Sequence, residues 1–181
     1  GIDSSTALSI YKNRDHFKHI RFTGIDMHIG SQITSIEPFV EAVKKLSYLY
    51  FEIEKDGLRL EHFDVGGGIG VSYNHEKSFS IFEFAEKTIP LFNKLNCDVI
   101  FEPGRYLTAN GGVLISEVLY NKKNGDKNFI VVDAAMNDLL RPSIYQAYHH
   151  IQPVNKAVDR KNLIADVVGP VCESGDYFAR D

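Results

Sequence analysis

The segment 60–70 reads LEHFDVGGGIG, and the fold that we predict follows from its pattern. Its first half, Leu60–Val65, is a short β-prone run that stops at a glycine cluster, which is typical of a strand followed by a loop. The three glycines carry no side chains, so their N–H groups could surround a phosphate. A purely structural tight turn explains them equally well. The spacing matches neither a dinucleotide fingerprint, whose third glycine would fall at Val71, nor a Walker loop.

The same pattern of a strand closed by a polar loop occurs on both sides of this segment. Ile20–Met27 is apolar and β-prone and runs into HIGSQ at 28–32, while Asp98–Phe101 runs into EPGR at 102–105. Amphipathic stretches separate the three strands, so the sequence predicts parallel strands joined by crossover helices. In such α/β folds, and in barrels above all, ligands bind at the C-terminal ends of the strands.

Three amphipathic stretches predict the helices. Residues 4–17 place their apolar side chains along one helical face, with a serine at the start as N-cap. The stretch 34–57 opens with a capping box from Thr34 to Glu37 and ends at a glycine. The third helix is expected over Ser80–Leu95, with its first serine as the cap.

After the third α/β unit the sequence becomes β-rich and irregular. The strands expected there are Gly112–Tyr120, Asn128–Val132 and Leu163–Val168. The change predicts a boundary near residue 107. We therefore expect two partial domains, an α/β barrel domain over residues 1–107 and a β-rich domain over residues 108–181.

The composition describes an ordinary globular chain. Its 181 residues include 20 basic and 24 acidic side chains, for a net charge of −4, which argues against a nucleic-acid or membrane-surface partner. No apolar run approaches the roughly 20 residues of a membrane-spanning helix. Cys97 and Cys172 are the only cysteines, so a disulfide scaffold is excluded and a cytoplasmic location is expected.

Several polar residues in the loops have both a chemical and a structural interpretation. Glu102 and Arg105 could act on a ligand or form an ion pair in a surface turn. His28 could stack on a ring, transfer protons or be a satisfied loop histidine. Arg141 and Tyr145, four residues apart, could grip one carboxylate or belong to a solvated connector.

The two cysteines differ in their surroundings. Free cysteines are usually small buried residues, and Cys97 is expected in the core on that ground. Cys172 instead lies in the polar loop GPVCESGD at 169–176, where a thiol can transfer protons. The histidines show no spacing for a metal site, and no serine or cysteine protease motif occurs.

The order of these motifs resembles that of a known family. HIGSQ, DVGGG, EPGR and GPVCESGD follow one another as in the pyridoxal-phosphate-dependent decarboxylases with an alanine-racemase-like barrel. RPSIY at 141–145 and the Cys172-Glu173 pair are most similar to the diaminopimelate decarboxylase branch. The resemblance covers essentially the whole chain. It implies an α/β fold: the C-terminal part of a pyridoxal-phosphate-binding (β/α)8 TIM barrel, with its last three strands, followed by the start of a β-rich C-terminal domain.

The resemblance implies a site for the cofactor pyridoxal 5'-phosphate. The glycines and Ser31 would hold its phosphate, and Glu102 would bond the pyridine nitrogen and favour the protonated pyridinium. His28 would stack on the pyridine ring and act as a catalytic residue. The implied cofactor-binding residues are His28, Ser31, Gly66, Gly67, Gly68, Glu102, Pro103, Gly104 and Arg105.

The resemblance also implies the reaction and the residues for the substrate. Arg105, Arg141 and Tyr145 would bind substrate carboxylate, and Glu173 would recognise a distal amino group. Cys172 would be catalytic, because it would protonate the α-carbon once CO2 has left. The implied activity is decarboxylation of meso-2,6-diaminopimelate to L-lysine, the last step of lysine biosynthesis. A sibling ornithine, arginine or carboxynorspermidine decarboxylase, or an inactive homologue that acts as a binding protein, is the alternative.

The partners expected from the resemblance are a small diamino-dicarboxylate substrate and a second copy of the chain. In this family a homodimer shares the site across its interface, with the Cys172-Glu173 loop reaching the partner's cofactor. The lysine that carries the cofactor in the family lies on an early barrel strand, and no lysine here occupies such a position. The chain is therefore expected to be the middle of a longer protein and inactive alone, with no metal.

Overall fold

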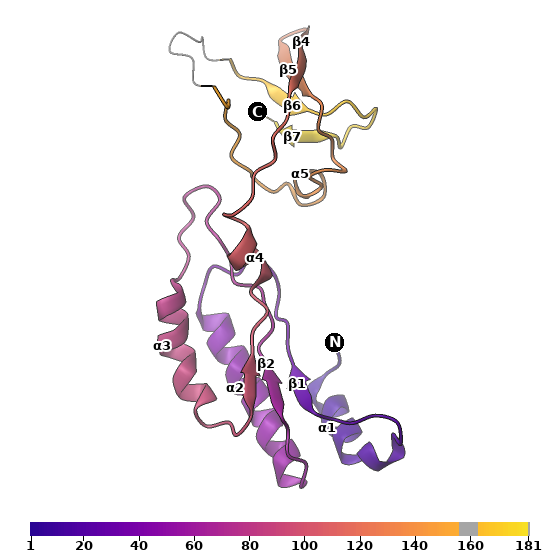
Figure 1. Ribbon diagram of the computed structural model, residues 1–181, viewed down its shortest axis with the longest axis vertical. Helices are drawn as coiled ribbons and strands as arrows, with labels where there is room; N and C mark the ends of the chain where they lie inside the picture. The colour runs from indigo at the N-terminus through magenta and orange to yellow at the C-terminus, as the bar shows by residue number, and fades with distance from the viewer. Residues whose placement is uncertain (156–162, 181) are drawn as a thin grey trace. The chain divides into compact units, whose positions relative to one another are not determined.

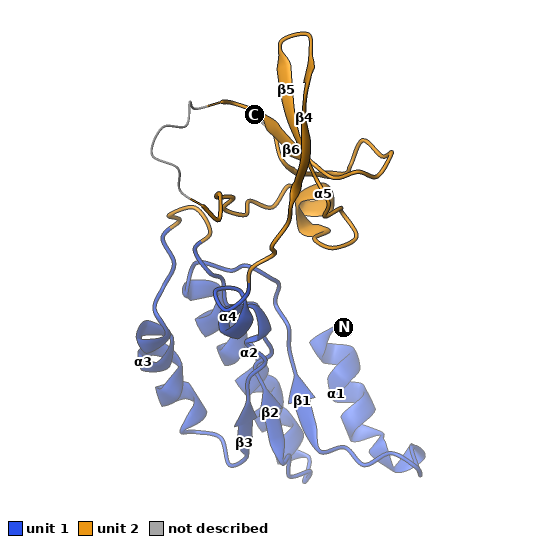
Figure 2. Cartoon of the chain, turned by 45° about the horizontal axis from the view of Figure 1, so that its top comes forward, with its two compact units in different colours: residues 1–72, 77–112 blue, residues 73–76, 113–181 orange. Residues whose placement is uncertain are grey.

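The computed structural model describes residues 1–155 and 163–180, which form two compact units (Figure 1). Unit 1 comprises Gly1–Ser72 and Lys77–Gly112, and unit 2 comprises Tyr73–Glu76 and Val113–Asp181, as coloured in Figure 2. The boundary expected near residue 107 stays a prediction about the domains. No helix within the described ranges is long and apolar enough to cross a membrane.

Unit 1 is a parallel sheet covered by helices. Its elements are α1 (Ser4–Lys12), the 3-10 helix η1 (Arg14–His16), β1 (Gly24–Asp26), α2 (Glu37–Lys55), β2 (His62–Asp64), α3 (Ile81–Phe92), β3 (Asp98–Ile100) and α4 (Gly104–Thr108). The strands lie in the order β1-β2-β3, all parallel, with Ile25, Phe63 and Val99 in register. Figure 1 shows α2 beside the sheet, between α1 and α3. The predicted alternation of parallel strands and helices is confirmed.

The core of unit 1 lies between β2 and α2. Phe63, at the centre of β2, is 0% exposed. The buried face of α2 consists of Phe39, Val43, Leu46, Leu49, Tyr50 and Ile53. The rings of Tyr50 and Phe63 meet edge to face with centroids 6.2 Å apart, a favourable aromatic geometry. This packing gives the loop after β2 a fixed starting point.

One of the predicted helix starts is confirmed. Ser80 caps α3 by accepting a hydrogen bond from the Glu83 N–H at 3.1 Å. At α1, however, the cap is not a serine. Asp3 accepts from the Thr6 N–H at 2.9 Å, because the helix begins one residue after it.

The capping box predicted at the start of α2 is wrong. The helix begins at Glu37, and its N-cap is Ile36, whose side chain makes no capping bond. Ile36 is 3% exposed and belongs to the core, so apolar burial rather than a hydroxyl positions this helix start. Pro38 in the first turn fits, because its fixed φ suits the beginning of a helix.

Unit 2 is a mixed four-stranded sheet. Its elements are β4 (Val118–Asn124), β5 (Lys127–Val132), α5 (Arg141–Tyr145), β6 (Asp166–Val168) and β7 (Tyr177–Ala179). The order is β4-β5-β6-β7, with β5 and β6 parallel and the outer pairs antiparallel. A small core of Val132, Ala134 and Phe178 lies against it. The prediction that the C-terminal part of the chain is rich in β-strands is confirmed.

The strand boundaries of unit 2 differ from the prediction. Residues 112–117 are not a strand, and β4 instead continues to Asn124, which pairs with Lys127 across a tight turn at Gly125. Hairpin pairing therefore extends β4 into a polar run that carries no apolar alternation. The five-residue helix α5 and the three-residue strand β7 were not predicted, because such short elements show no periodicity.

Candidate active site

The loops after the three parallel strands of unit 1 remain hydrogen-bonded to one another. The Met27 N–H donates to the Asp64 carbonyl at 3.1 Å, and the Val65 N–H donates to the Ile100 carbonyl at 2.9 Å. One residue further on, the Glu102 N–H donates to the Gly66 carbonyl at 2.9 Å. Because the ladder continues past the strand ends, the polar clusters that follow β1, β2 and β3 meet at one edge of the sheet, as the sequence predicts.

The glycine cluster is required by close backbone packing. A Cβ on Gly67 would overlap the backbone carbonyl oxygen of Glu102, and one on Gly68 would overlap that of Gly30. Gly68 also has a φ of 97°, which side-chain-bearing residues rarely adopt. Close backbone packing therefore requires glycine here, as the tight-turn interpretation predicts, and this leaves phosphate binding as a separate question.

The N–H groups of this cluster are only partly available. The Gly66 N–H donates to Asp64 Oδ1 at 2.8 Å, and the Gly67 N–H donates to His28 Nδ1 at 3.3 Å. The Gly68 N–H has no acceptor among the described residues. Of the three predicted donors, the Gly68 N–H is thus available to an anion. The bond from Gly67 holds the exposed His28 ring against the glycine loop.

Arg105 reaches across to the loop after β1 instead of pairing with its neighbour. Its Nη2 donates to Ser31 Oγ at 2.9 Å, and its Nη1 lies 3.4 Å from Gln32 Oε1. The structure describes both Arg105 and Glu102, and no ion pair joins them. The surface ion-pair interpretation is wrong, because the α4 helix turns Arg105 toward the first loop and leaves the Glu102 side chain exposed.

Gln32 is a site residue that the sequence reasoning missed. Its Nε2 donates to the Val71 carbonyl at 2.5 Å, and its Oε1 accepts from the Val71 N–H at 3.2 Å. Its φ is 58°, a left-handed conformation that costs a non-glycine residue about 1–3 kcal/mol. The clasp on Val71 offsets that strain and ties the loops after β1 and β2 together. No local pattern in HIGSQ signals it.

In unit 2, Arg141 is held by two residues that were not predicted. Its Nη1 donates to Tyr73 Oη at 3.2 Å and lies 3.1 Å from His149 Nε2. The guanidinium carbon is 5.2 Å from the centre of the Tyr73 ring, a cation–π distance. Tyr145, at the other end of α5, is 71% exposed. The structure thus places Arg141 and Tyr145 on one helical turn, with only the arginine locked in place.

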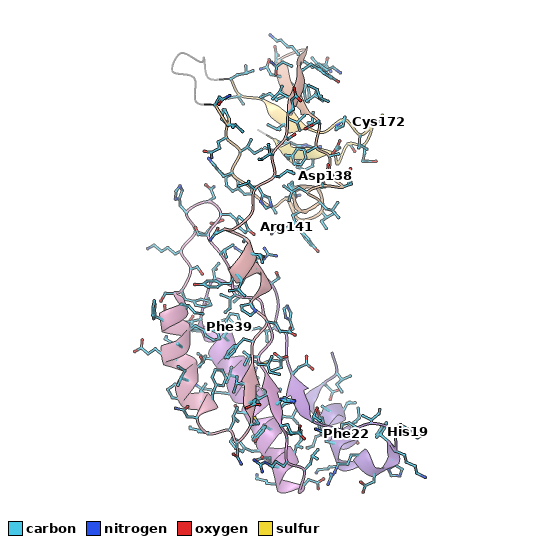
Figure 3. All side chains as sticks on the ribbon, in the orientation of Figure 1. His19, Phe22, Phe39, Asp138, Arg141 and Cys172 are labelled. Atoms are coloured by element: carbon cyan, nitrogen blue, oxygen red, sulfur yellow. The ribbon has the colours of Figure 1, made fainter. Side chains whose placement is uncertain are left out.

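The predicted thiol and carboxylate of unit 2 lie on the loop between β6 and β7. Cys172, labelled in Figure 3, is free and exposed. Glu173 is also exposed, and the Gly175 N–H, followed by the Ser174 hydroxyl, lowers the pKa of its carboxyl group. Glu173 is therefore negatively charged at neutral pH.

A hydrogen bond connects this loop to α5. The Ser143 hydroxyl donates to the Gly175 carbonyl, so the helix that carries Arg141 is held against the loop that carries Cys172. The four candidate residues of unit 2 consequently lie on two segments that contact each other. Within the described ranges no group of three or more acidic, histidine or cysteine side chains could hold a metal ion.

Cys97 is half-buried and packs against the core of unit 1, in agreement with its predicted structural role. Burial raises the pKa of its thiol, and the neighbouring Tyr50 hydroxyl acts in the opposite direction. A thiol kept protonated in an apolar setting is inert.

The packing of Gly67 yields a direct prediction for the full-length protein. Gly67→Ala should lower the free energy of unfolding by about 1–3 kcal/mol, since the methyl group must push the glycine loop away from the Glu102 backbone. Denaturant unfolding followed by circular dichroism measures the change. Gly104→Ala is the matched control, because a Cβ there meets no atom within 4 Å. Equal stability of the two variants would contradict the packing argument.

Comparison with known proteins gives the relatives of this chain. Residues 1–109 match the family model for the pyridoxal-binding domain of pyridoxal-dependent decarboxylases. The chain is 43% identical to the diaminopimelate decarboxylase of Aquifex aeolicus, over 100% of this chain and 43% of that protein. With that of Haemophilus influenzae the identity is 39%, over 99% of this chain and 44% of the other. The chain thus spans less than half the length of these curated relatives.

Solved structures share the fold. A diaminopimelate decarboxylase from Helicobacter pylori, complexed with L-lysine, superposes with a TM-score of 0.90 at 39% identity, over 100% of this chain and 45% of that one. A lysine/ornithine decarboxylase from Vibrio vulnificus reaches a TM-score of 0.86 at 23% identity, over 99% of this chain and 49% of that one, and so shows the fold alone. The expected fold class, part of a pyridoxal-phosphate-binding barrel followed by a β-rich region, is confirmed. Because the family model matches more than half of its length, this chain belongs to the pyridoxal-dependent decarboxylases.

Proposed function

We propose that the full-length protein is a carboxy-lyase that decarboxylates meso-2,6-diaminopimelate to L-lysine, the last step of lysine biosynthesis. One observation carries the proposal: the loops after three parallel strands bring His28, Gly68 and the Ser31–Arg105 pair to one edge of the sheet. The similarity to diaminopimelate decarboxylases along the whole chain supports this particular substrate.

The residues at this edge fit pyridoxal phosphate. Three donors suit a phosphate dianion: the Gly68 N–H, which has no acceptor among the described residues, the Ser31 hydroxyl and the Arg105 guanidinium. The exposed His28 ring, held by the Gly67 N–H, offers a flat face for stacking. When bound, pyridoxal phosphate supplies the electron sink that allows an amino acid to lose CO2 from its α-carbon.

Glu102 is the proposed partner of the pyridine nitrogen of the cofactor. Its backbone is fixed by the bond from its N–H to the Gly66 carbonyl at 2.9 Å, while its side chain stays exposed at the end of β3. A carboxylate next to a ring nitrogen favours the protonated form of that nitrogen. We assign Glu102 to hold this proton.

The substrate is bound by complementary charges. Both hydrogen bonds described for the Arg141 side chain use Nη1, so Nη2 can still donate to a carboxylate, with the exposed Tyr145 four residues away. The ionised Glu173 suits the distal ammonium group of the substrate. Arg105 is a further candidate for carboxylate binding.

Cys172 is the proposed proton donor to the α-carbon after CO2 has left. Its thiol is exposed on a loop with fixed backbone, where the Glu173 N–H donates to the Val171 carbonyl at 2.8 Å. The face of the α-carbon that this thiol reaches determines on which side of that carbon, a CH2 group in L-lysine, the new proton is placed.

We further propose that the protein is a homodimer in the cytoplasm. The exposure of both Cys172 and Glu173 supports a loop that reaches the cofactor of a second copy. The two free cysteines support a reducing compartment. The expected complex thus has two sites, each built from both protomers.

The decisive experiment measures CO2 release by the full-length protein loaded with pyridoxal phosphate. Diaminopimelate should be preferred over ornithine, arginine, lysine and carboxynorspermidine by about 10⁴-fold in kcat/KM, because these lack the second carboxylate that Arg141 requires. Preference for any of the others would identify a sibling decarboxylase. Absence of CO2 from every substrate would identify an inactive homologue.

Arg141 tests the substrate assignment. Arg141→Met keeps most of the side-chain volume but removes the charge, and KM for diaminopimelate should rise by about 10- to 100-fold, the loss of a charge-assisted bond to a carboxylate. Steady-state kinetics measures the change. Arg21→Met, which removes an exposed arginine whose partner is Glu61, is the control and should leave KM unchanged. An unaltered KM in the Arg141 variant would remove the assignment.

Cys172 tests the proton-donor role. Cys172→Ala should bind pyridoxal phosphate as the wild type does, but kcat should fall by about 10²- to 10⁴-fold, the usual contribution of a general acid. Cofactor absorbance and CO2 release measure the two effects separately. Cys97→Ala is the matched thiol control and should retain full turnover. Full turnover in the Cys172 variant would refute the role.

A further inference from the structure

Asp176 is a buried carboxylate at the end of the Cys172 loop, and neither cofactor nor substrate binding accounts for it. The residue is 3% exposed. Its Oδ1 accepts a hydrogen bond from the Met136 N–H at 2.6 Å, and its Oδ2 accepts one from the Val171 N–H at 2.7 Å. A carboxylate taken out of water is costly unless it is hydrogen-bonded. The two backbone donors therefore offset the cost of burying Asp176.

The neighbouring backbone makes room for this carboxylate. A Cβ on Gly169 would overlap the oxygens of Asp176 and approach the Ala134 carbonyl oxygen at 2.7 Å. Gly169 itself donates its N–H to the Asp176 carbonyl at 3.1 Å. The side chain and main chain of Asp176 therefore close the loop 169–176 at its base, while residues 170–174 are exposed.

The two donors belong to segments that carry the proposed catalytic and substrate-binding groups. Val171 immediately precedes Cys172. Met136 lies in the turn after β5, which continues into α5 and Arg141. One carboxylate thus bonds both segments, and each bond is of the short charge-assisted kind. Without it, the backbone before Cys172 would lose its attachment to the rest of unit 2 at this point.

We propose that Asp176 is a positioning residue for Cys172. This inference rests on the proposed function, in which the thiol must meet one carbon atom from one side. Such a transfer tolerates little displacement, because an error of about 1 Å in a reacting group can cost 10²-fold in rate. Asp176 acts through the Val171 backbone and touches neither cofactor nor substrate.

Asp176→Asn in the full-length protein tests the proposal. The amide keeps the shape of the carboxylate, but its NH2 group faces one of the two backbone donors and leaves that N–H unpaired. We expect kcat to fall by about 10- to 100-fold, as for other residues that orient a functional group, while cofactor absorbance stays near the wild type. The solvent deuterium isotope effect on kcat should increase, because proton transfer from a displaced thiol becomes slower.

Asp138→Asn is the matched control. Asp138, labelled in Figure 3, accepts a hydrogen bond from the Ala135 N–H at 2.8 Å in the same turn after β5, but its side chain is exposed. This variant loses the same kind of bond without touching the Cys172 loop. It should keep the wild-type kcat and isotope effect.

Three outcomes would overturn the proposal. The first is a folded Asp176→Asn variant with wild-type kcat and isotope effect, and the second is an equal loss of kcat in both variants. The third is fast hydrogen exchange of the Val171 and Met136 amides in the wild-type protein, because the two hydrogen bonds to Asp176 should make it slow. This measurement applies even if Asp176→Asn fails to fold. A wild type without decarboxylase activity refutes the proposed function instead, and the exchange measurement still tests the two hydrogen bonds to Asp176.

Discussion

The contact between the backbones of Gly67 and Glu102 is the constraint on which unit 1 depends. No side chain fits between the loops after β2 and β3, so they can share hydrogen bonds beyond the strand ends only with glycine at this position. The contact places the His28 ring and the Glu102 backbone next to the same residue. The N–H of the next residue, Gly68, has no acceptor among the described residues. The packing of these loops thus requires a residue without a Cβ at position 67.

In unit 2 the loop that carries Cys172 is held by a different kind of interaction. There the backbone around Cys172 is tied by a buried charge, since each oxygen of Asp176 accepts one main-chain N–H. A small sheet with only a few buried apolar residues has little core with which to hold a loop. Charge-assisted bonds supply the missing rigidity, and Gly169 provides the space they need.

Much of the fold could be predicted because its signals are local. A β-prone run that stops at glycines marks a strand end, and the Ser80 cap marks the start of α3. Most of the unpredicted features depend on residues far away in the chain. Ile36 starts α2 because it is buried in the core, and Gln32 adopts its strained backbone because Val71 lies beside it. Neither fact is visible in the neighbouring residues.

The parallel α/β arrangement and the chemical groups at the strand ends could be predicted from the sequence, because both follow from residue type and short-range spacing. Which of these groups meet depends on how the chain folds. Arg105 bonds Ser31, 74 residues away, and not Glu102; Arg141 bonds Tyr73 across 68 residues. The physical reason is that a side chain pairs with whatever the folded backbone brings within about 3 Å, and spacing along the chain does not encode that distance.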